Sequence, residues 1–111
     1  MDIIKPSIVI FKWKQSLNSY SEIALGIEEE GALYTIYESD ENAYEMAYKA
    51  ALKSKLGIGI GIDDKVACIV LRNMKKGQAL FVDNIEDRIK MRILGYNAAR
   101  YVKGEPFIIK D

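Results

Sequence analysis

A strict two-residue alternation between residues 57 and 62 constrains the fold of this 111-residue chain more than any other feature. Glycine stands at positions 57, 59 and 61, and isoleucine at positions 58, 60 and 62. Because successive side chains of a strand point to opposite faces, the segment predicts a strand with one bare face and one branched apolar face. We expect the bare face to let the backbone of a helix approach closely.

The connector after this strand sets the direction of the next one. Three residues, 63–65, separate Ile62 from an apolar run that begins at Val66. A connection of that length permits a hairpin but not a parallel crossover. We therefore expect segment 66–72 to run antiparallel to segment 57–62.

The rest of the chain alternates between strand-like and helix-like hydrophobic periods. Strands are expected at 7–13, 32–37, 57–62, 66–72 and 79–82, with a loop at 73–78. Helices are expected up to about residue 30, at 42–53 and at 85–103. The pattern predicts one domain over residues 1–111, with a three-layer α/β/α fold. Its sheet should be mixed and mostly parallel, with about five strands, one of them antiparallel.

Helix ends carry their own signals. The first helix would be capped by Asn18 or Ser21, the second by Ser39 or Asp40, and the third by Asn84. Gly31 and Gly104 suit left-handed helix stops, and Gly95 is a point where the third helix could be interrupted.

Composition excludes several classes of function. Sixteen basic residues balance sixteen acidic ones, so the chain has no overall positive field to hold nucleic acid. The run from residue 7 to 11 is too short for a signal core or a membrane span. Cys68, the only cysteine, lies in an apolar run and should be a buried, inert thiol. Histidine is absent, which removes the usual general base and the commonest zinc ligand. A cytoplasmic chain fits these observations.

Two other patterns argue against small-molecule and metal sites. A dinucleotide site needs its glycines at the exit of a strand leading into a helix, whereas those at 57–61 lie inside a strand that a hairpin follows. Asp63, Asp64 and Asp83 lack a third oxygen ligand at suitable spacing, so turn and cap roles are expected for them.

The acidic run Glu28, Glu29 and Glu30 breaks a local rule. It falls at the carbonyl end of the first predicted helix, where each carboxylate is disfavoured by roughly 0.3–1 kcal/mol. The three charges also repel one another. Such violations are expected at functional sites, but a charge run is more often simply a solvated acidic edge. Removing the charge of Glu29 should then leave stability unchanged or raise it slightly.

The segment 95–107 combines small residues, aromatic residues and cations, and it reads Gly-Tyr-Asn-Ala-Ala-Arg-Tyr-Val-Lys-Gly-Glu-Pro-Phe. Arg100 and Lys103 in this segment suit the carbonyl end of their own helix. Together with Leu-Gly-Ile-Glu-Glu-Glu-Gly at 25–31, it resembles the small subunits of the reactivases of adenosylcobalamin-dependent diol and glycerol dehydratases. A weaker match lies at 57–63. The three matches keep their order and spacing. The loop 73–78, rich in lysine and glycine, departs from the family.

This resemblance implies a non-catalytic adaptor with a fold similar to that of the dehydratase medium subunit. The partner implied is a large subunit with an actin-like ATPase domain that binds ADP or ATP, in a complex of two large and two small subunits. The client implied is a diol or glycerol dehydratase that carries damaged cobalamin. In the family, a glutamate of the first-helix motif reaches a divalent cation, Mg²⁺, held mainly by the large subunit. By motif position that residue is Glu29, with Glu28 and Glu30 beside it at the interface.

Two alternatives remain open on the sequence. The chain could be a medium subunit of a cobalamin-dependent dehydratase, or a fragment of one, although medium subunits typically carry an amino-terminal extension. It could also be a stand-alone nucleotide-binding α/β enzyme, although the first strand-to-helix junction, 14–18, has no glycine. Neither the diol that the client uses nor association with a microcompartment follows from the sequence.

Overall fold

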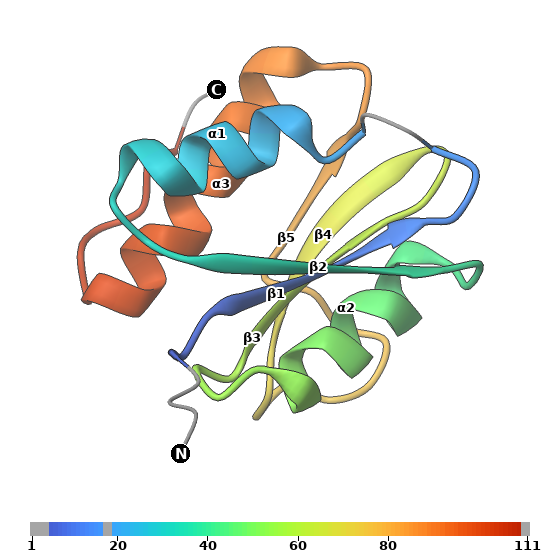
Figure 1. Cartoon of the computed structure of the whole chain (residues 1–111), viewed down its shortest axis with the longest axis horizontal. Coiled ribbons are helices and arrows are strands. Elements are labelled where there is room, and N and C mark those ends of the chain that lie inside the picture. The colour runs from blue at the N-terminus through green and yellow to red at the C-terminus, as the bar shows by residue number, and fades with distance from the viewer. Residues whose placement is uncertain (1–4, 17–18, 110–111) are drawn as a thin grey trace.

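The computed structural model describes residues 5–16 and 19–109 and places one five-stranded sheet between helices (Figure 1). The strands are β1 (Ile8–Trp13), β2 (Tyr34–Ser39), β3 (Ile58–Ile62), β4 (Val66–Leu71) and β5 (Phe81–Asn84). The helices are α1 (Ser21–Glu29), α2 (Ala43–Lys53) and α3 (Arg88–Lys103).

The sheet has the mixed topology expected from the sequence. Its strand order is β2-β1-β3-β4-β5, and β1 pairs in parallel with both β2 and β3. β4 pairs antiparallel with β3 and with β5, so it alone runs against the other four strands. The predicted hairpin between β3 and β4 is therefore confirmed, and the backbone N–H of Asp63 closes its turn on the carbonyl of Val66 at 3.0 Å.

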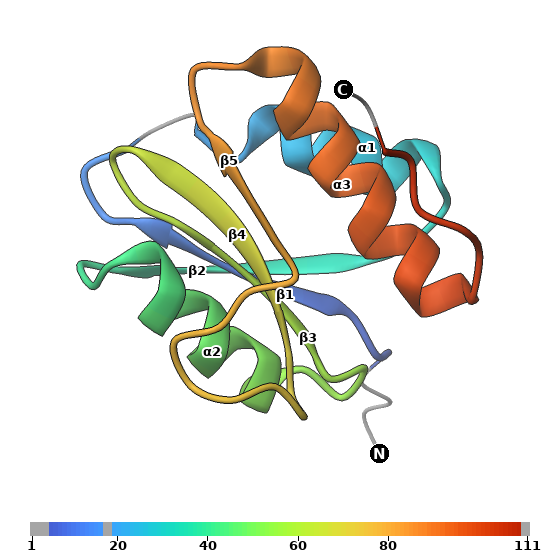
Figure 2. The same ribbon diagram turned by 180° about the vertical axis from the view of Figure 1, so that it is seen from behind.

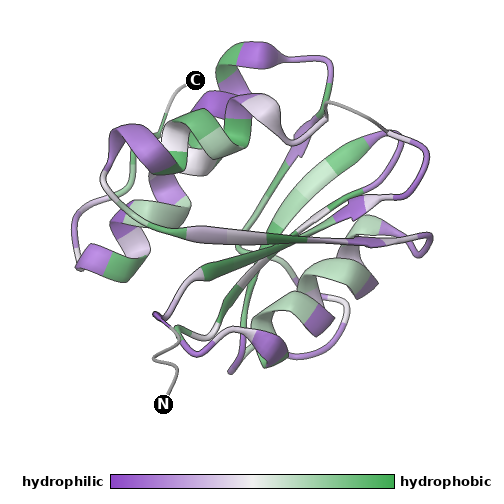
Figure 3. Cartoon of the chain, in the orientation of Figure 1, coloured by the Kyte–Doolittle hydropathy of each residue, from purple (hydrophilic) through white to green (hydrophobic). Residues whose placement is uncertain are grey.

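Helices cover both faces of the sheet, as two opposite views show (Figure 1 and Figure 2). α1 and α3 pack together on one face over the main core, to which the three isoleucines of β3 belong. α2 packs alone on the other face, over a smaller core that includes Cys68 and Val70. Hydrophobic residues concentrate in the central strands and on the inner sides of the helices (Figure 3). Among the described residues, no helix is long and apolar enough to cross a membrane.

The bare face of β3 receives the backbone of α2, as predicted. A methyl group added at Gly59 would overlap the backbone of Ala47 and Ala51, and one added at Gly61 would overlap the carbonyl of Ala43. Every residue of α2 in these contacts is a fully buried alanine. Small residues on both partners therefore set the distance between this helix and the sheet.

A second close approach joins α1 to α3. Gly26 and Gly95 face each other, and a methyl group on Gly95 would overlap the backbone carbonyl of Ile23. The two helices run parallel, because contacts advance along both of them from the Glu22–Arg88 pair to the Glu30–Lys103 pair. α3 continues through Gly95 without a break, so the expected interruption does not occur.

The predicted helix caps were wrong wherever the structure describes them. Tyr20 precedes α1 without a side-chain cap, and Ser21 is already helical, while Asn18 lies outside the described residues. Two other side chains accept the capping hydrogen bonds at 3.0 Å, Asn42 from the N–H of Glu45 and Asp87 from the N–H of Lys90. In each case a polar side chain nearer the helix displaced the one chosen from sequence: Asn42 took the place of Ser39 and Asp40, and Asp87 that of Asn84.

Two strands begin two residues later than expected. β2 begins at Tyr34 because the N–H of Ala32 bonds to the carbonyl of Ile27 and completes the helix stop, in which Gly31 has a φ of 80°. β5 begins at Phe81 after a turn in which the N–H of Gln78 bonds to the carbonyl of Lys75. Gly104 ends α3 at a φ of 74°, so both glycine stops are confirmed.

Ion pairs at the start of α1 join this helix to α3. Glu22, in the first turn of α1, accepts from the guanidinium groups of Arg88 at 3.0 Å and Arg92 at 2.9 Å. Hydrogen bonding from Arg88, with a further contribution from Arg92, lowers the pKa of Glu22 below its ordinary value of 4.5. Folding therefore favours the ionised carboxylate.

Replacing Gly59 with alanine should destabilise the chain by at least about 3 kcal/mol, since the methyl group has no space to enter. Gly57→Ala is the matched control. It meets only the Arg72 side chain at 3.6 Å and should cost about 1–2 kcal/mol for its left-handed φ of 73°. Urea unfolding measures both variants. Equal losses would contradict the close packing of α2 on β3.

Glu22→Gln should lower the free energy of unfolding at neutral pH, because it removes both ion pairs with α3. The lowered pKa means that the stabilisation is complete above the ordinary value of 4.5 and is lost as pH falls through the folded-state value. The two proteins should therefore converge in stability at low pH. Urea unfolding at several pH values tests this, with exposed Glu86→Gln as the charge-removal control. A stability difference that does not change with pH would refute the ion-pair explanation.

Candidate functional site at the end of α1

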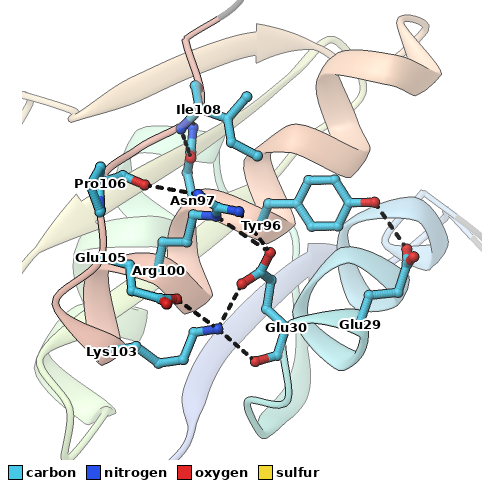
Figure 4. Close-up of polar contacts among 9 residues, drawn as sticks. All are labelled: Glu29, Glu30, Tyr96, Asn97, Arg100, Lys103, Glu105, Pro106 and Ile108. Carbon is cyan, nitrogen blue, oxygen red and sulfur yellow. Dashed lines mark hydrogen bonds and ion pairs between the residues drawn. The ribbon is translucent and has the colours of Figure 1, made fainter.

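The acidic run lies where α1 ends, beside the middle and end of α3 (Figure 4). Glu28 and Glu29 are the last residues of α1, and Glu30 is its C-terminal cap. No basic residue lies in the last turn of α1 itself. The three side chains contact different partners, so the run is not one cluster of equivalent carboxylates.

Glu30 is the most heavily paired of the three. One carboxylate oxygen accepts from Lys103 Nζ at 2.6 Å, and the other accepts from the guanidinium of Arg100 at 3.3 Å. Its side chain is only 16% exposed. Hydrogen bonds from Lys103 and then Arg100 lower its pKa. Because both oxygens are occupied, Glu30 is poorly placed to bind anything further.

Glu29 is paired through one oxygen only. Its Oε1 accepts from Arg92 Nη1 at 2.5 Å and from Tyr96 Oη at 3.2 Å. Within residues 5–16 and 19–109, no hydrogen bond or ion pair reaches Oε2. The side chain is 51% exposed. Glu29 thus combines a fixed position with an available oxygen.

Glu28 turns toward the sheet edge instead. Its Oε1 accepts from the hydroxyl of Tyr34, in β2, at 2.9 Å. Burial, followed by this hydrogen bond to a carboxylate, raises the pKa of Tyr34. Among the described residues, the only partner of the Glu28 carboxylate is therefore a neutral hydroxyl on Oε1, and the side chain is exposed.

Cations of α3 compensate the electrostatic anomaly that the sequence indicates. Arg92, Arg100 and Lys103 pair with Glu29 and Glu30, and Lys103 Nζ also donates to the backbone carbonyl of Glu30 at 2.9 Å. Arg100 and Lys103 were expected to serve the end of α3, yet they also neutralise the end of α1. These pairs revise the expected effect of removing the Glu29 charge to a small loss of stability, at most about 1 kcal/mol.

Spacing along α3 is the signal that could have found these partners. Residues 92, 96 and 100 are four apart and so lie on one face of a helix. That face carries Arg92, Tyr96 and Arg100, each of which contacts the acidic run. The sequence alone did not show that this face meets α1.

The remainder of the carboxy-terminal motif fastens the tail. The side-chain amide of Asn97, 2% exposed, donates to the carbonyl of Ile108 at 2.9 Å and accepts from its N–H at 2.7 Å. Arg100 Nη1 donates to the carbonyl of Pro106 at 3.2 Å (Figure 4). Arg100 therefore contacts both the acidic run and the tail.

The described residues contain no complete site for a divalent cation. Among the described residues, no group of three or more His, Cys, Asp or Glu side chains could hold a metal ion. Asp63 is engaged in the turn and at the start of α2, where it accepts from three backbone N–H groups, those of Lys65, Val66 and Ala43, as expected. Asp83 lies within β5 rather than at a cap. A hard cation prefers carboxylate oxygen, and among the described residues Oε2 of Glu29 and Oε2 of Glu28 are unpaired oxygens of this kind.

Neither the glycine strand nor the cysteine offers an alternative site. The bare face of β3 is filled by α2, which leaves no room for a phosphate at Gly59 or Gly61. Cys68 is fully buried, as predicted, and burial raises the pKa of its thiol to about 12, which favours the protonated and unreactive form. An open groove of about 570 Å³ does lie along α3, lined by Glu22, Arg88, Ile89, Arg92, Ile93 and Tyr96.

Known proteins resemble the chain over nearly its whole length. A curated relative from Citrobacter freundii, the propanediol dehydratase-reactivating factor small subunit, is 35% identical over 96% of this chain and 93% of the relative. The diol dehydratase-reactivating factor small subunit of Klebsiella michiganensis is 34% identical over 79% of this chain and 72% of the relative. Both names agree with the resemblance stated from the sequence.

Solved structures agree with these relatives. The structure of diol dehydratase-reactivating factor complexed with ADP and Mg²⁺ matches with a TM-score of 0.90 and 31% identity, over 96% of this chain and all of the matched chain. A glycerol dehydratase reactivase matches with a TM-score of 0.89 at 23% identity, over 95% of this chain and 98% of that chain, which supports the fold alone. The family model of the dehydratase medium subunit matches residues 5–108. The chain therefore belongs to the dehydratase medium subunit family, and its predicted resemblance to the small subunits of dehydratase-reactivating factors is confirmed.

Proposed function

We propose that this chain is the small adaptor subunit of a chaperone-like, ATP-dependent factor that reactivates a diol or glycerol dehydratase. The observation that carries the proposal is its similarity to reactivating-factor small subunits, at 35% identity over 96% of the chain. The adaptor would mimic or displace the medium subunit of the dehydratase, whose family it shares. Damaged cobalamin would then leave, and intact cofactor would replace it.

The partner is a large ATPase subunit that holds ADP or ATP, with two large and two small subunits in the assembly. The matched reactivating factor was solved with ADP and Mg²⁺, which supports a nucleotide and a cation in such a complex. Catalysis then resides on the large subunit. In agreement, the one thiol of this chain is protonated and buried, and its glycine-rich strand is covered by α2. We place the complex in the cytoplasm, with or without association with a microcompartment.

Glu29 is the residue through which the chain reaches the Mg²⁺ of the large subunit. Support comes from its half-exposed carboxylate, its place at the end of α1 and its Oε2, which has no partner in the part of the chain that the structure describes. Glu30 lacks an available oxygen, and Glu28 turns toward β2. Bound to the partner, the cation would favour the ionised carboxylate and offset the remaining unfavourable effect of the helix end.

The family model is named for the dehydratase medium subunit, so the competing function is that of a medium subunit in a dehydratase. The two functions differ in partner. Purified chain should form a complex with a reactivase large subunit and restore activity to a dehydratase that holds cyanocobalamin, given ATP, Mg²⁺ and adenosylcobalamin. Omitting the chain should abolish recovery. Assembly with a dehydratase large subunit into an active enzyme would instead establish the competing function.

The isolated chain should neither hydrolyse ATP nor bind it at micromolar concentration, because α2 fills the glycine face of β3 and leaves no room there for a phosphate. Isothermal titration calorimetry of the purified chain with ATP and Mg²⁺ measures this directly. The large subunit, titrated in parallel, provides the positive control. Micromolar binding to the chain alone would refute the adaptor assignment.

Glu29→Gln should weaken Mg²⁺-dependent association with the large subunit by at least about tenfold, since a neutral amide is a poorer ligand for a hard cation. The measurement is the affinity of the two subunits over a range of Mg²⁺ concentrations. Glu28→Gln is the matched control, with the same chemical change one residue away, and should behave like the unmodified chain. If both variants associate equally well at every Mg²⁺ concentration, the acidic run is only a solvated edge and Glu29 is not a ligand.

A further inference from the structure

We propose that Arg92 and Tyr96 of α3 are positioning residues for the cation ligand Glu29. They hold one of its carboxylate oxygens and leave the other open toward the partner subunit. This inference rests on the proposed role of Glu29 and adds how the carboxylate is prepared before the large subunit arrives.

Both donors converge on the same atom. Arg92 Nη1 and Tyr96 Oη each donate to Glu29 Oε1, at 2.5 and 3.2 Å, and they lie one turn apart on α3. Two donors on one oxygen restrict rotation of the carboxylate about its terminal bond. Groups that hold a metal ligand from behind typically fix its orientation and raise its affinity for the metal. The half-exposed Glu29 side chain therefore presents its free oxygen in a defined direction.

Arg92 is itself fixed by a second carboxylate. Its Nε donates to Glu22 Oε2 at 2.9 Å, and its Nη2 lies 2.8 Å from the same oxygen. The guanidinium thus spans two residues of α1 that are two turns apart. Arg88 also pairs with Glu22, so the formal charges of the two carboxylates and the two guanidinium groups cancel. Arg92 can therefore orient Glu29 without leaving a net positive charge in this group to repel a cation.

The glycine contact between the helices makes this arrangement possible. Gly95 lies between Arg92 and Tyr96 in the sequence and meets Gly26 where the backbones of α3 and α1 are in contact. Without side chains at that contact, α3 comes near enough for both donors to reach Glu29. The neighbouring carboxylates differ, because Glu30 has both oxygens occupied and Glu28 has one tyrosine donor from β2.

The experiment separates positioning from bulk packing by comparing two tyrosine substitutions. Each variant is assembled with the large subunit, and association is measured as a function of Mg²⁺ concentration. Tyr96→Phe removes a hydroxyl that donates to Glu29, and Tyr34→Phe removes the equivalent hydroxyl that donates to Glu28. We expect Tyr96→Phe to raise the midpoint Mg²⁺ concentration about tenfold with the same association at saturation. Tyr34→Phe should leave the midpoint unchanged.

Arg92 is tested with two substitutions of different severity. Arg92→Gln should raise the Mg²⁺ midpoint, and Arg92→Lys, which keeps the charge, should partly restore it. Thermal melting of each free variant checks that the chain still folds. A midpoint unchanged in both Tyr96→Phe and Arg92→Gln overturns the positioning proposal. So does a loss of association that Mg²⁺ cannot restore, because it would make Tyr96 a direct contact of the partner.

Glu29→Gln distinguishes a failure of the positioning role from a failure of the proposed ligand role of Glu29. If that variant shifts the midpoint while the Arg92 and Tyr96 variants do not, Glu29 remains a ligand and the positioning role is refuted. If Glu29→Gln itself leaves the midpoint unchanged, the ligand role and the positioning role fall together.

Discussion

The contact between α1 and α3 at Gly26 and Gly95 is the constraint on which the site depends. Backbone meets backbone there, so the separation of the two helices is set by atoms that cannot adopt another rotamer. Because the separation is fixed, side chains on both sides of the glycine contact pair across the two helices. Glu22 pairs with Arg88 before the contact along the chain, and Glu30 pairs with Lys103 after it. Packing thus determines the electrostatics at this end of the molecule.

The electrostatic environment at the end of α1 therefore depends on residues of both α1 and α3. An acidic run at a carbonyl end is unfavourable on a helix considered alone, yet here Arg92, Arg100 and Lys103 of α3 offset it. The offset is uneven, since Glu30 is satisfied on both oxygens and Glu29 on one. Three identical residues in the sequence therefore have different surroundings in the structure, and the repeated letter conceals that difference.

Local pattern was enough to predict the existence and order of the elements. The bare face of β3 followed from a run of six residues, and its hairpin with β4 followed from the three-residue connector. Caps and strand starts failed, because neighbouring polar side chains compete for the same N–H groups, and Asn42 and Asp87 won that competition. The partners of the acidic run could not be found locally. Arg92 lies 63 positions from Glu29, and Lys103 lies 73 positions from Glu30.

The burial of Cys68 gives the chain a built-in reporter of its own motions. This single thiol lies in the core beneath α2, with a pKa of about 12, so a thiol reagent at neutral pH can reach it only when that layer separates from the sheet. Its labelling rate therefore measures how often α2 lifts away. Cys68 is the only cysteine in the sequence, so the labelling signal comes from this one position.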